Sequence, residues 1–189
     1  MNFVRPFVFC ALAAALAGCA TVELVPADKA ASVGNGISVM PQRSWNKIAK
    51  NPDTWTTQGP QIDRVRFFAG IKSGHALIEV PGMKPEQVGL FDSKMLPNDL
   101  QDLVVAALQK EGNKTIQAGN LAPCNFGAGK GFCFDLTFAS PADLEMKGLV
   151  MARKQNDQLD LILFQAPAEY YFGEMSPDVQ KVFASVQAK

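Results

Sequence analysis

The only histidine in the 189-residue chain, His75, is the side chain that a Ser-His-Asp or Cys-His catalytic site would require. It lies in the segment KSGHALIEV, and the nucleophile motif G-x-S-x-G does not occur in the sequence. A lone histidine in a loop is usually solvated. A hydrolase that uses His75 therefore stays open only as the third interpretation of the function.

Two other patterns resemble sites but favour structural explanations. The glycine-rich GAGKG at residues 127–131 lacks the G-x-x-x-x-G-K-[ST] spacing, and the alternating stretch after it offers no helix N-terminus to a phosphate. Asp99 and Asp102 lie at the start of an expected helix, where acidic side chains stabilise the helix dipole. With no C-x-x-C pair and no close carboxylate pair, the sequence predicts no catalytic residues, no metal site and no cofactor.

A cysteine ends the apolar run at the N-terminus. The eleven uncharged residues from 7 to 17 are too few to cross a bilayer, which takes about 20, but suit a secretory signal. Residues 16–19, Leu-Ala-Gly-Cys, resemble the lipobox of bacterial lipoproteins. The resemblance implies that residues 1–18 are removed as a signal peptide. It also implies that Cys19 receives a diacylglyceryl group and that its new amino group is acylated, for example with palmitate.

The residue after Cys19 bears on the destination. In proteobacterial lipoproteins an aspartate at this position tends to retain the protein at the inner membrane, and this chain has Ala20. In a Gram-negative host the resemblance therefore implies the periplasmic face of the outer membrane. Two or more acyl chains make such an attachment stable, so the membrane is an expected partner through the lipid anchor.

Cys124 and Cys133 are the cysteines that remain after processing and lipidation. Two thiols of an exported chain usually pair in the oxidising periplasm. A two-residue turn at Ala128 and Gly129 would place the two cysteines opposite each other on adjacent strands, and longer loops would shift this pairing. The sequence thus predicts a disulfide, with a redox or metal pair as the alternative.

Composition excludes some classes of partner. The chain is 48% apolar, which suffices for a core, and its length suggests one domain. Lys plus Arg and Asp plus Glu are 18 each, so there is no basic surplus to attract nucleic acid. We therefore expect no nucleic-acid binding.

The spacing of apolar residues predicts the elements that must carry any site. Residues 19–35 read as a lipidated flexible tether, and residues 36–189 as a single α+β domain. Alternation and turn signals predict strands in GISVM, DRVRFFAGI, GFCFDLTFA, KGLVMARKQ and QLDLILFQA, the last two joined by a turn at Asn156-Asp157. DRVRFFAGI should have one solvated face, on which Arg64 and Arg66 lie.

Helical spacing occurs in two segments. PNDLQDLVVAALQKEG places leucines and valines on one face, with Pro97 at its start. SPDVQKVFASVQAK should begin with Ser176 as N-cap and Pro177 in the first turn. Together the elements predict a mainly antiparallel sheet with one face covered by helices.

The order of these elements resembles a known fold. A short strand that runs into PQRSW, with Pro41 and Trp45, precedes a central helix, a late meander and a C-terminal helix. This order is similar to the PsbP-like fold, which small bacterial lipoproteins of the DcrB kind share. The resemblance implies an α-β-α arrangement over residues 36–187 and an accessory or binding role without catalytic residues.

Aromatic residues offer the remaining candidate site. Tyr170, Tyr171 and Phe172 lie between the last strand and the last helix, where they suit either a binding rim or a cap on the core. The first hypothesis is a lipid-anchored periplasmic accessory protein that binds another envelope component without catalysis. The alternative is a small-molecule-binding lipoprotein, with a pocket lined by Trp45, Trp55 and these tyrosines.

Overall fold

The structure is a computed structural model that describes residues 22–34, 36–50 and 52–188. The predicted signal peptide, the lipobox cysteine Cys19 and Ala20 lie outside the described residues. Among the helices of the described ranges, none is both long enough and apolar enough to cross a membrane.

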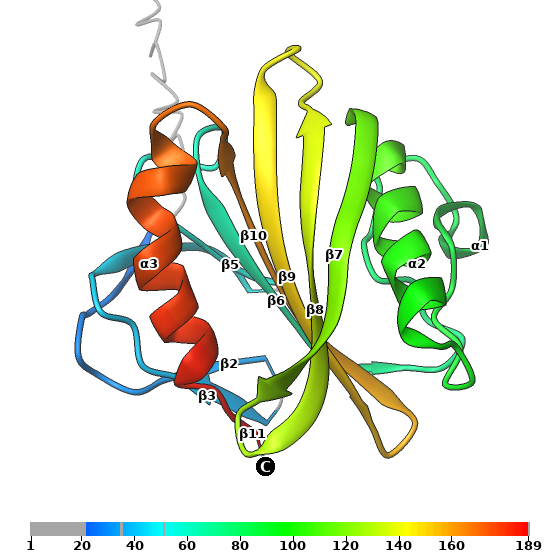
Figure 1. Cartoon of the computed structure of the whole chain (residues 1–189), viewed down its shortest axis with the longest axis horizontal. Coiled ribbons are helices and arrows are strands. Elements are labelled where there is room, and N and C mark those ends of the chain that lie inside the picture. The colour runs from blue at the N-terminus through cyan, green and yellow to red at the C-terminus, as the bar shows by residue number, and fades with distance from the viewer. Residues whose placement is uncertain (1–21, 35, 51, 189) are drawn as a thin grey trace, which may run out of the picture.

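An eight-stranded antiparallel sheet forms the centre of the molecule, with the strand order β1-β4-β5-β6-β10-β9-β8-β7 (Figure 1). Its strands are β1 (Glu23–Val25), β4 (Trp45–Lys50), β5 (Asp53–Thr56), β6 (Arg64–Lys72), β7 (Lys114–Phe126), β8 (Gly129–Ala139), β9 (Glu145–Gln155) and β10 (Gln158–Pro167). A small second sheet has the order β11-β3-β2, with β2 (Ala31–Val33), β3 (Ile37–Val39) and β11 (Gln187–Ala188).

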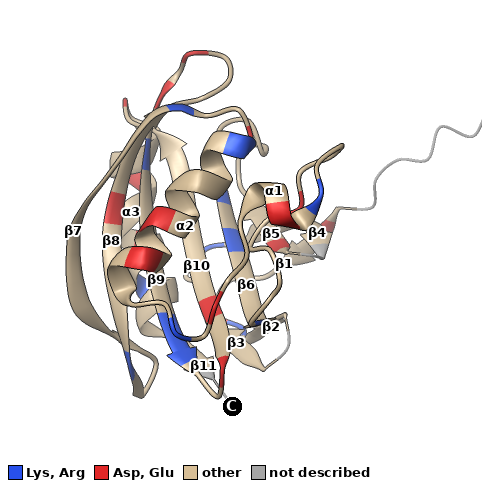
Figure 2. Cartoon of the chain, turned by 90° about the vertical axis from the view of Figure 1, so that its right-hand side faces the viewer, with Lys and Arg blue, Asp and Glu red and all other residues tan. Residues whose placement is uncertain are grey.

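The helices lie on opposite faces of the large sheet. The helix α2 (Pro97–Lys110), with the short α1 (Pro85–Val88) beside it, packs on one face, and α3 (Tyr171–Ala184) and the small sheet pack on the other (Figures 1 and 2). The prediction of a mainly antiparallel sheet with helices is confirmed. The expectation that helices cover only one face is wrong, because buried apolar residues point to both sides of the central strands.

Alternation along the strands produces two separate cores. In β8, Phe132, Phe134, Leu136 and Phe138 face α2, as their spacing predicts. In β6, Val65 and Phe67 face α3. The large sheet is therefore a central layer with an apolar core on each side.

The segment expected to be a flexible tether is folded from Glu23 onward. Strand β1 pairs with β4, and β2 pairs with β3. Val25 and Val33 are buried in the core on the α3 side, and burial of these side chains stabilises the two short strands. The assignment of residues 23–33 to the tether is therefore wrong.

The C-terminal helix begins earlier than predicted. It starts at Tyr171, so Ser176 is not its N-cap but lies inside it, where its hydroxyl donates to the carbonyl oxygen of Phe172. Pro177 also lies inside the helix. Burial of Met175 against the sheet favours the additional turn, and packing thus outweighs the local capping signal.

The turn predicted at Asn156 and Asp157 is confirmed. Strands β9 and β10 form the predicted hairpin, and Asn156 and Asp157 have φ values of 51° and 58°. Both residues thus adopt the left-handed conformation that a tight two-residue turn requires. Helix α2 also begins at Pro97 as predicted and ends at Lys110, one residue before the predicted end, and Asp99 accepts a hydrogen bond from the Leu96 amide at 2.7 Å.

Candidate functional site

A cleft of about 670 Å³ lies on the α2 side of the large sheet, over β4, β5 and β6. We call it the Arg64 cleft. Residues of the strands form one side of the cleft, and the segment 76–88 forms the other. The lining residues are Ile48, Pro52, Thr54, Pro60, Arg64, Arg66, Ala76, Ile78, Glu79, Val80, Pro81, Met83, Pro85, Val88 and Glu111. A neighbouring hollow of about 350 Å³ shares Arg64, Glu79 and Glu111 with it.

Strand alternation explains why arginines reach this cleft. In β6 the side chains of Val65 and Phe67 enter the α3-side core, so Arg64 and Arg66 must point to the α2 side. Gln165 of the adjacent strand β10 pairs with Arg64 in the sheet register and lies on the same face. The sheet thus brings two guanidinium groups and one amide together.

A single carboxylate, Glu111, balances both arginines. Arg66 donates to it through two nitrogens, at 2.6 and 3.1 Å, while the nearest nitrogen of Arg64 is 3.7 Å from Glu111 Oε2. The oxygen of Gln165 accepts from Arg64 Nε at 3.0 Å and from Arg66 Nη2 at 2.9 Å. The expectation that this face of β6 is solvated is therefore wrong for Arg66, which is buried because α2 ends beside it with Glu111.

Arg64 carries the less neutralised of the two charges. Burial, followed by repulsion from Arg66, lowers the pKa of Arg64 to about 10, and the attraction of Glu111 offsets this only in part. Its side chain keeps 30% of its exposure and lines both hollows. The group is therefore accessible to a ligand in the cleft.

Two buried donors near this network have no partner. Arg66 Nε and Gln165 Nε2 are inaccessible to solvent and donate to no atom of the described residues. Buried polar groups usually have a hydrogen-bond partner. A ligand with an acceptor atom could therefore supply the partner that these two donors lack, after a small rearrangement of the side chains. The cleft can thus bind an anionic or hydrogen-bond-accepting group.

The described lining residues of the cleft include no histidine, serine or cysteine that could act as a catalytic base or nucleophile. Its two carboxylates are Glu79 and Glu111, and Glu111 is paired with the arginines. No group of three or more His, Cys, Asp or Glu residues that could hold a metal ion occurs within residues 22–34, 36–50 and 52–188.

His75 lies apart from the Arg64 cleft's charged network. It is exposed in the loop after β6 (Arg64–Lys72), and its Nδ1 lies 3.4 Å from the carbonyl oxygen of Ser73. Within the described part of the chain its ring makes no hydrogen bond to another side chain. The structure does not bring a nucleophile to His75.

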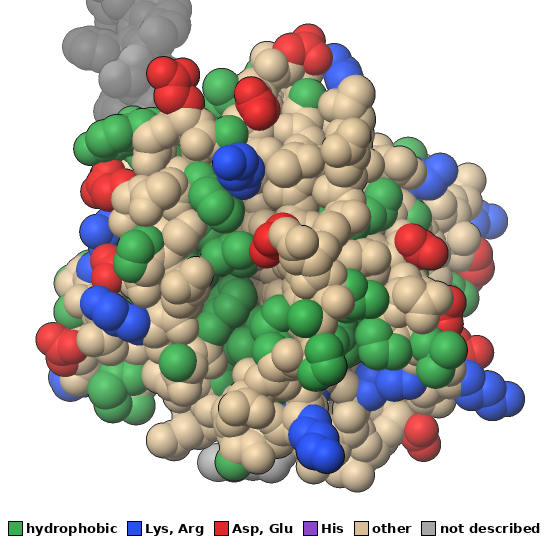
Figure 3. Space-filling model, viewed as in Figure 1, with side chains coloured by type: hydrophobic (Ala, Val, Ile, Leu, Met, Phe, Trp, Pro, Cys, Tyr) green, Lys and Arg blue, Asp and Glu red, His purple; other side chains and the backbone are tan. Residues whose placement is uncertain are grey.

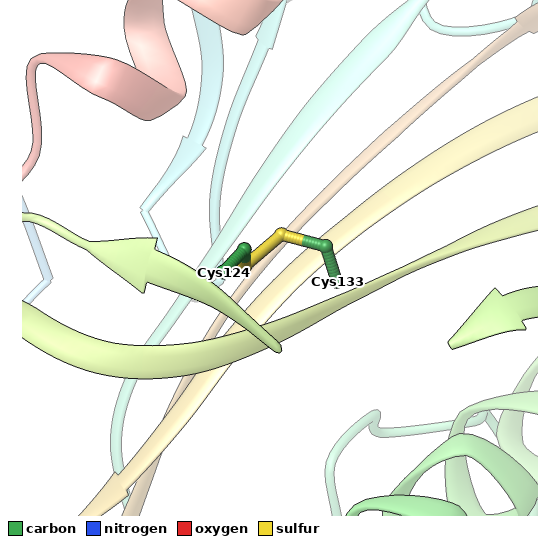
Figure 4. The surroundings of a disulfide bond; sticks show 2 residues. All are labelled: Cys124 and Cys133. Carbon is green, nitrogen blue, oxygen red and sulfur yellow. A yellow bond between two sulfur atoms is a disulfide. The ribbon is translucent and has the colours of Figure 1, made fainter. Parts of the chain in front are cut away.

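Cys124 and Cys133 form the predicted disulfide, with their Cα atoms 5.8 Å apart (Figure 4). The predicted register is wrong by two residues, because the turn contains Gly127 and Ala128 in place of Ala128 and Gly129, and Phe126 pairs with Gly129. Cys124 is therefore opposite Gly131, and the bridge joins diagonal neighbours. A positive φ of 60° at residue 127, which glycine tolerates, favours this turn.

The aromatic residues of the expected binding rim do not come together at the surface. Trp45 and Trp55 are each 1% exposed and belong to the core on the α3 side. Tyr170 is 70% exposed and packs edge-on against the half-buried Tyr171, with ring centroids 5.2 Å apart. A pocket lined by the tryptophans and the tyrosines is therefore absent from the described residues.

A second hollow lies beside α3 on the opposite face of the sheet. It has a volume of about 380 Å³, and Leu149, Phe172 and Lys147 are among its lining residues. Figure 3 shows hydrophobic side chains at the surface next to α3. This hollow lacks buried unpaired donors, so the Arg64 cleft is the stronger candidate site.

Sequence reasoning missed the residues of the Arg64 cleft, although one signal was present. Two arginines that alternate with apolar residues on one strand place both charges on one face. The partners Glu111 and Gln165 are more than 40 residues away in the sequence, and only the fold brings them close. No protein-family model matches the chain, and a comparison with curated proteins found no match.

Proposed function

We propose that the chain is a lipid-anchored, non-catalytic accessory protein of the cell envelope, held through Cys19 at the periplasmic face of the outer membrane. The lipobox-like residues 16–19 support the anchor. The disulfide between Cys124 and Cys133 supports export, because such bonds persist in oxidising compartments.

The Arg64 cleft is the proposed binding site for another envelope component. The single observation that carries this proposal is a ligand-sized hollow of about 670 Å³ with two arginines that share one carboxylate. A partner that presents a carboxylate or phosphate would supply the missing acceptor. The chemistry required is charge-assisted hydrogen bonding, without bond cleavage.

Site-specific photocrosslinking in the native envelope tests this proposal. A photoreactive amino acid replaces Met83, which is exposed at the wall of the cleft, or Leu144, which is equally exposed but lies in the β8–β9 turn. We expect a crosslinked envelope protein from position 83 and none from position 144. Crosslinks from position 144 alone would refute the cleft as the binding site.

The second candidate function is binding of a small anionic molecule. The volume of the cleft favours it, because ligand pockets typically measure about 300–1,000 Å³. Mass spectrometry of compounds released from purified wild type and from Arg64→Gln tests it. A compound present with the wild type and depleted with the variant, together with no protein crosslink at position 83, would favour this function over the first.

We also propose that the fold is PsbP-like. The central helix and the C-terminal helix on opposite faces of a mainly antiparallel sheet support the α-β-α arrangement that this resemblance implies. An experimental structure that superimposes on that fold family over residues 36–187 would test it.

A further inference from the structure

The distance between the proposed anchor and the fold is very short. Strand β1 begins at Glu23, so only three residues separate it from Cys19. Four residue steps reach at most about 14 Å, even when the chain is fully extended. A tether that ends at residue 35 would have allowed the domain to move freely above the membrane, and the folded β1 removes most of that freedom.

Together with the thickness of the bilayer, this short distance limits how far the domain can lie from the membrane. Acyl chains attached to Cys19 must lie in the hydrocarbon core, and the polar layer on each side of that core is on the order of 5–8 Å thick. The first residue of β1 then lies at most about 6–9 Å beyond the outer limit of the headgroups. Because β1 is the edge strand of the large sheet, this edge must face the bilayer.

The side chains at this edge suit contact with lipid. Val22 is 56% exposed and Leu24 is 63% exposed, although both are apolar. The nearest charges in the following turn, Asp28 and Lys29, are both exposed and opposite in sign. Glu23, between the two apolar residues, is also exposed, so the segment 22–29 carries one net negative charge. Its contact with lipid therefore relies on the hydrophobic effect of Val22 and Leu24 and not on attraction to anionic lipid.

We propose that the β1 edge of the domain lies on the lipid surface of the membrane that anchors the chain, with Leu24 in the headgroup region. This inference rests on the proposed lipidation of Cys19. The occupant of the apolar edge is the bilayer, because three residues are too few to let another large body enter between the anchor and the edge.

The orientation also places the Arg64 cleft. Leu24 pairs with Asn46, and Asn46 pairs with Thr56, so these three residues form a row on one face of the sheet. Thr54, which lines the cleft, pairs with Arg66 on that same face. The cleft begins one strand away from β1, at Ile48 of β4, and a component bound there lies close to the lipid surface.

Fluorescence quenching in vesicles tests the orientation. The lipidated full chain carries Leu24→Cys, whose free thiol is labelled with the environment-sensitive dye NBD, in vesicles of phosphatidylethanolamine and phosphatidylglycerol. The matched control is Gln117→Cys, at an exposed position of β7 on the opposite edge of the sheet. With nitroxide-labelled lipid, we expect loss of most of the fluorescence at position 24 and little loss at position 117.

The outcomes separate this inference from the anchor proposal. Flotation with the vesicles reports whether the chain is anchored, and failure to float refutes both proposals. A chain that floats but shows equal quenching at positions 24 and 117 refutes the orientation alone. Insertion of ten glycine and serine residues between Thr21 and Val22 should reduce the quenching at position 24, and unchanged quenching would refute the role of the short connection.

Discussion

The two faces of the large sheet differ in how they are closed. On the α3 side, Trp55, Phe67, Phe164 and Val179 form a continuous apolar core under α3 and the small sheet. On the α2 side, the apolar core ends where α2 ends, and Arg64, Arg66 and Glu111 continue from there into an open cleft. At β5 and β6 the sheet thus has a sealed face under α3 and an open face at the Arg64 cleft, whereas the hollow beside α3 lies over β7, β8 and β9.

This difference separates stability from binding. Apolar burial stabilises the α3 side without specificity for a ligand, whereas desolvated charges on the α2 side cost free energy unless they are paired. Residues of β6 supply both faces by alternation, so a single strand links the core to the cleft. Variants on the two sides should therefore lose stability for different reasons and by different amounts.

The largest effect should come from the sealed face. Phe183 lies on the buried face of α3 and is 8% exposed. Phe183→Ala should lower the free energy of unfolding by about 3–5 kcal/mol, because it leaves a cavity. Gln180→Ala on the exposed side of the same helix should change it by less than about 0.5 kcal/mol. Urea denaturation measures both, and equal effects would show that α3 does not depend on this burial.

Breaking the charge network should have the next largest effect. Glu111→Gln leaves two arginines without their carboxylate, and we expect a loss of about 2–3 kcal/mol, less than for a wholly buried pair because solvent reaches Glu111. Asp143→Asn is the control, since its ion pair with Lys114 is exposed and should contribute at most about 1 kcal/mol. A similar loss for the two variants would mean that the network is not desolvated.

The disulfide between β7 and β8 should contribute about as much to stability as the charge network. Replacement of Cys124 and Cys133 by serine should cost about 2–3 kcal/mol, mainly because the unfolded chain gains freedom. Reductant should lower the denaturation midpoint of the wild type and leave the double variant unchanged. Two free thiols in the denatured, unreduced wild type would contradict the bridge.

The sealed face was also the more predictable one from the sequence. The period-2 pattern of β8 and the helical spacing of Val179, Val182 and Phe183 indicate burial directly, since local periodicity fixes which side chains share a face. The start of α3 was missed because burial of Met175 extends the helix past the cap signal at Ser176. The type of these elements could thus be predicted where one face is apolar, but the start of α3 could not.

The open face could not be predicted in the same way. The cleft depends on contacts between β6, β10 and the end of α2, and no local pattern connects Arg66 with Glu111 or Gln165. Strands β1 and β2 were missed for a related reason, because each has three residues and is ordered by its neighbours rather than by its own pattern. The cleft and the two short strands thus depend on contacts between residues far apart in the sequence, which local patterns do not reveal.

The smallest effect on stability should come from replacement of Arg64. Because the pKa of Arg64 is lowered to about 10 in the folded protein, its charge opposes folding below pH 10, and this penalty disappears as the pH rises further above 10. Arg64→Gln removes the penalty along with a hydrogen bond to Gln165, so we expect a net change within about 1 kcal/mol. Arg66→Gln should cost more, because Arg66 makes the bidentate contact with Glu111. Thermal melts at pH 7 compare the two, and a larger loss for Arg64→Gln would show that Arg64 supports the fold instead of remaining available in the cleft for a ligand.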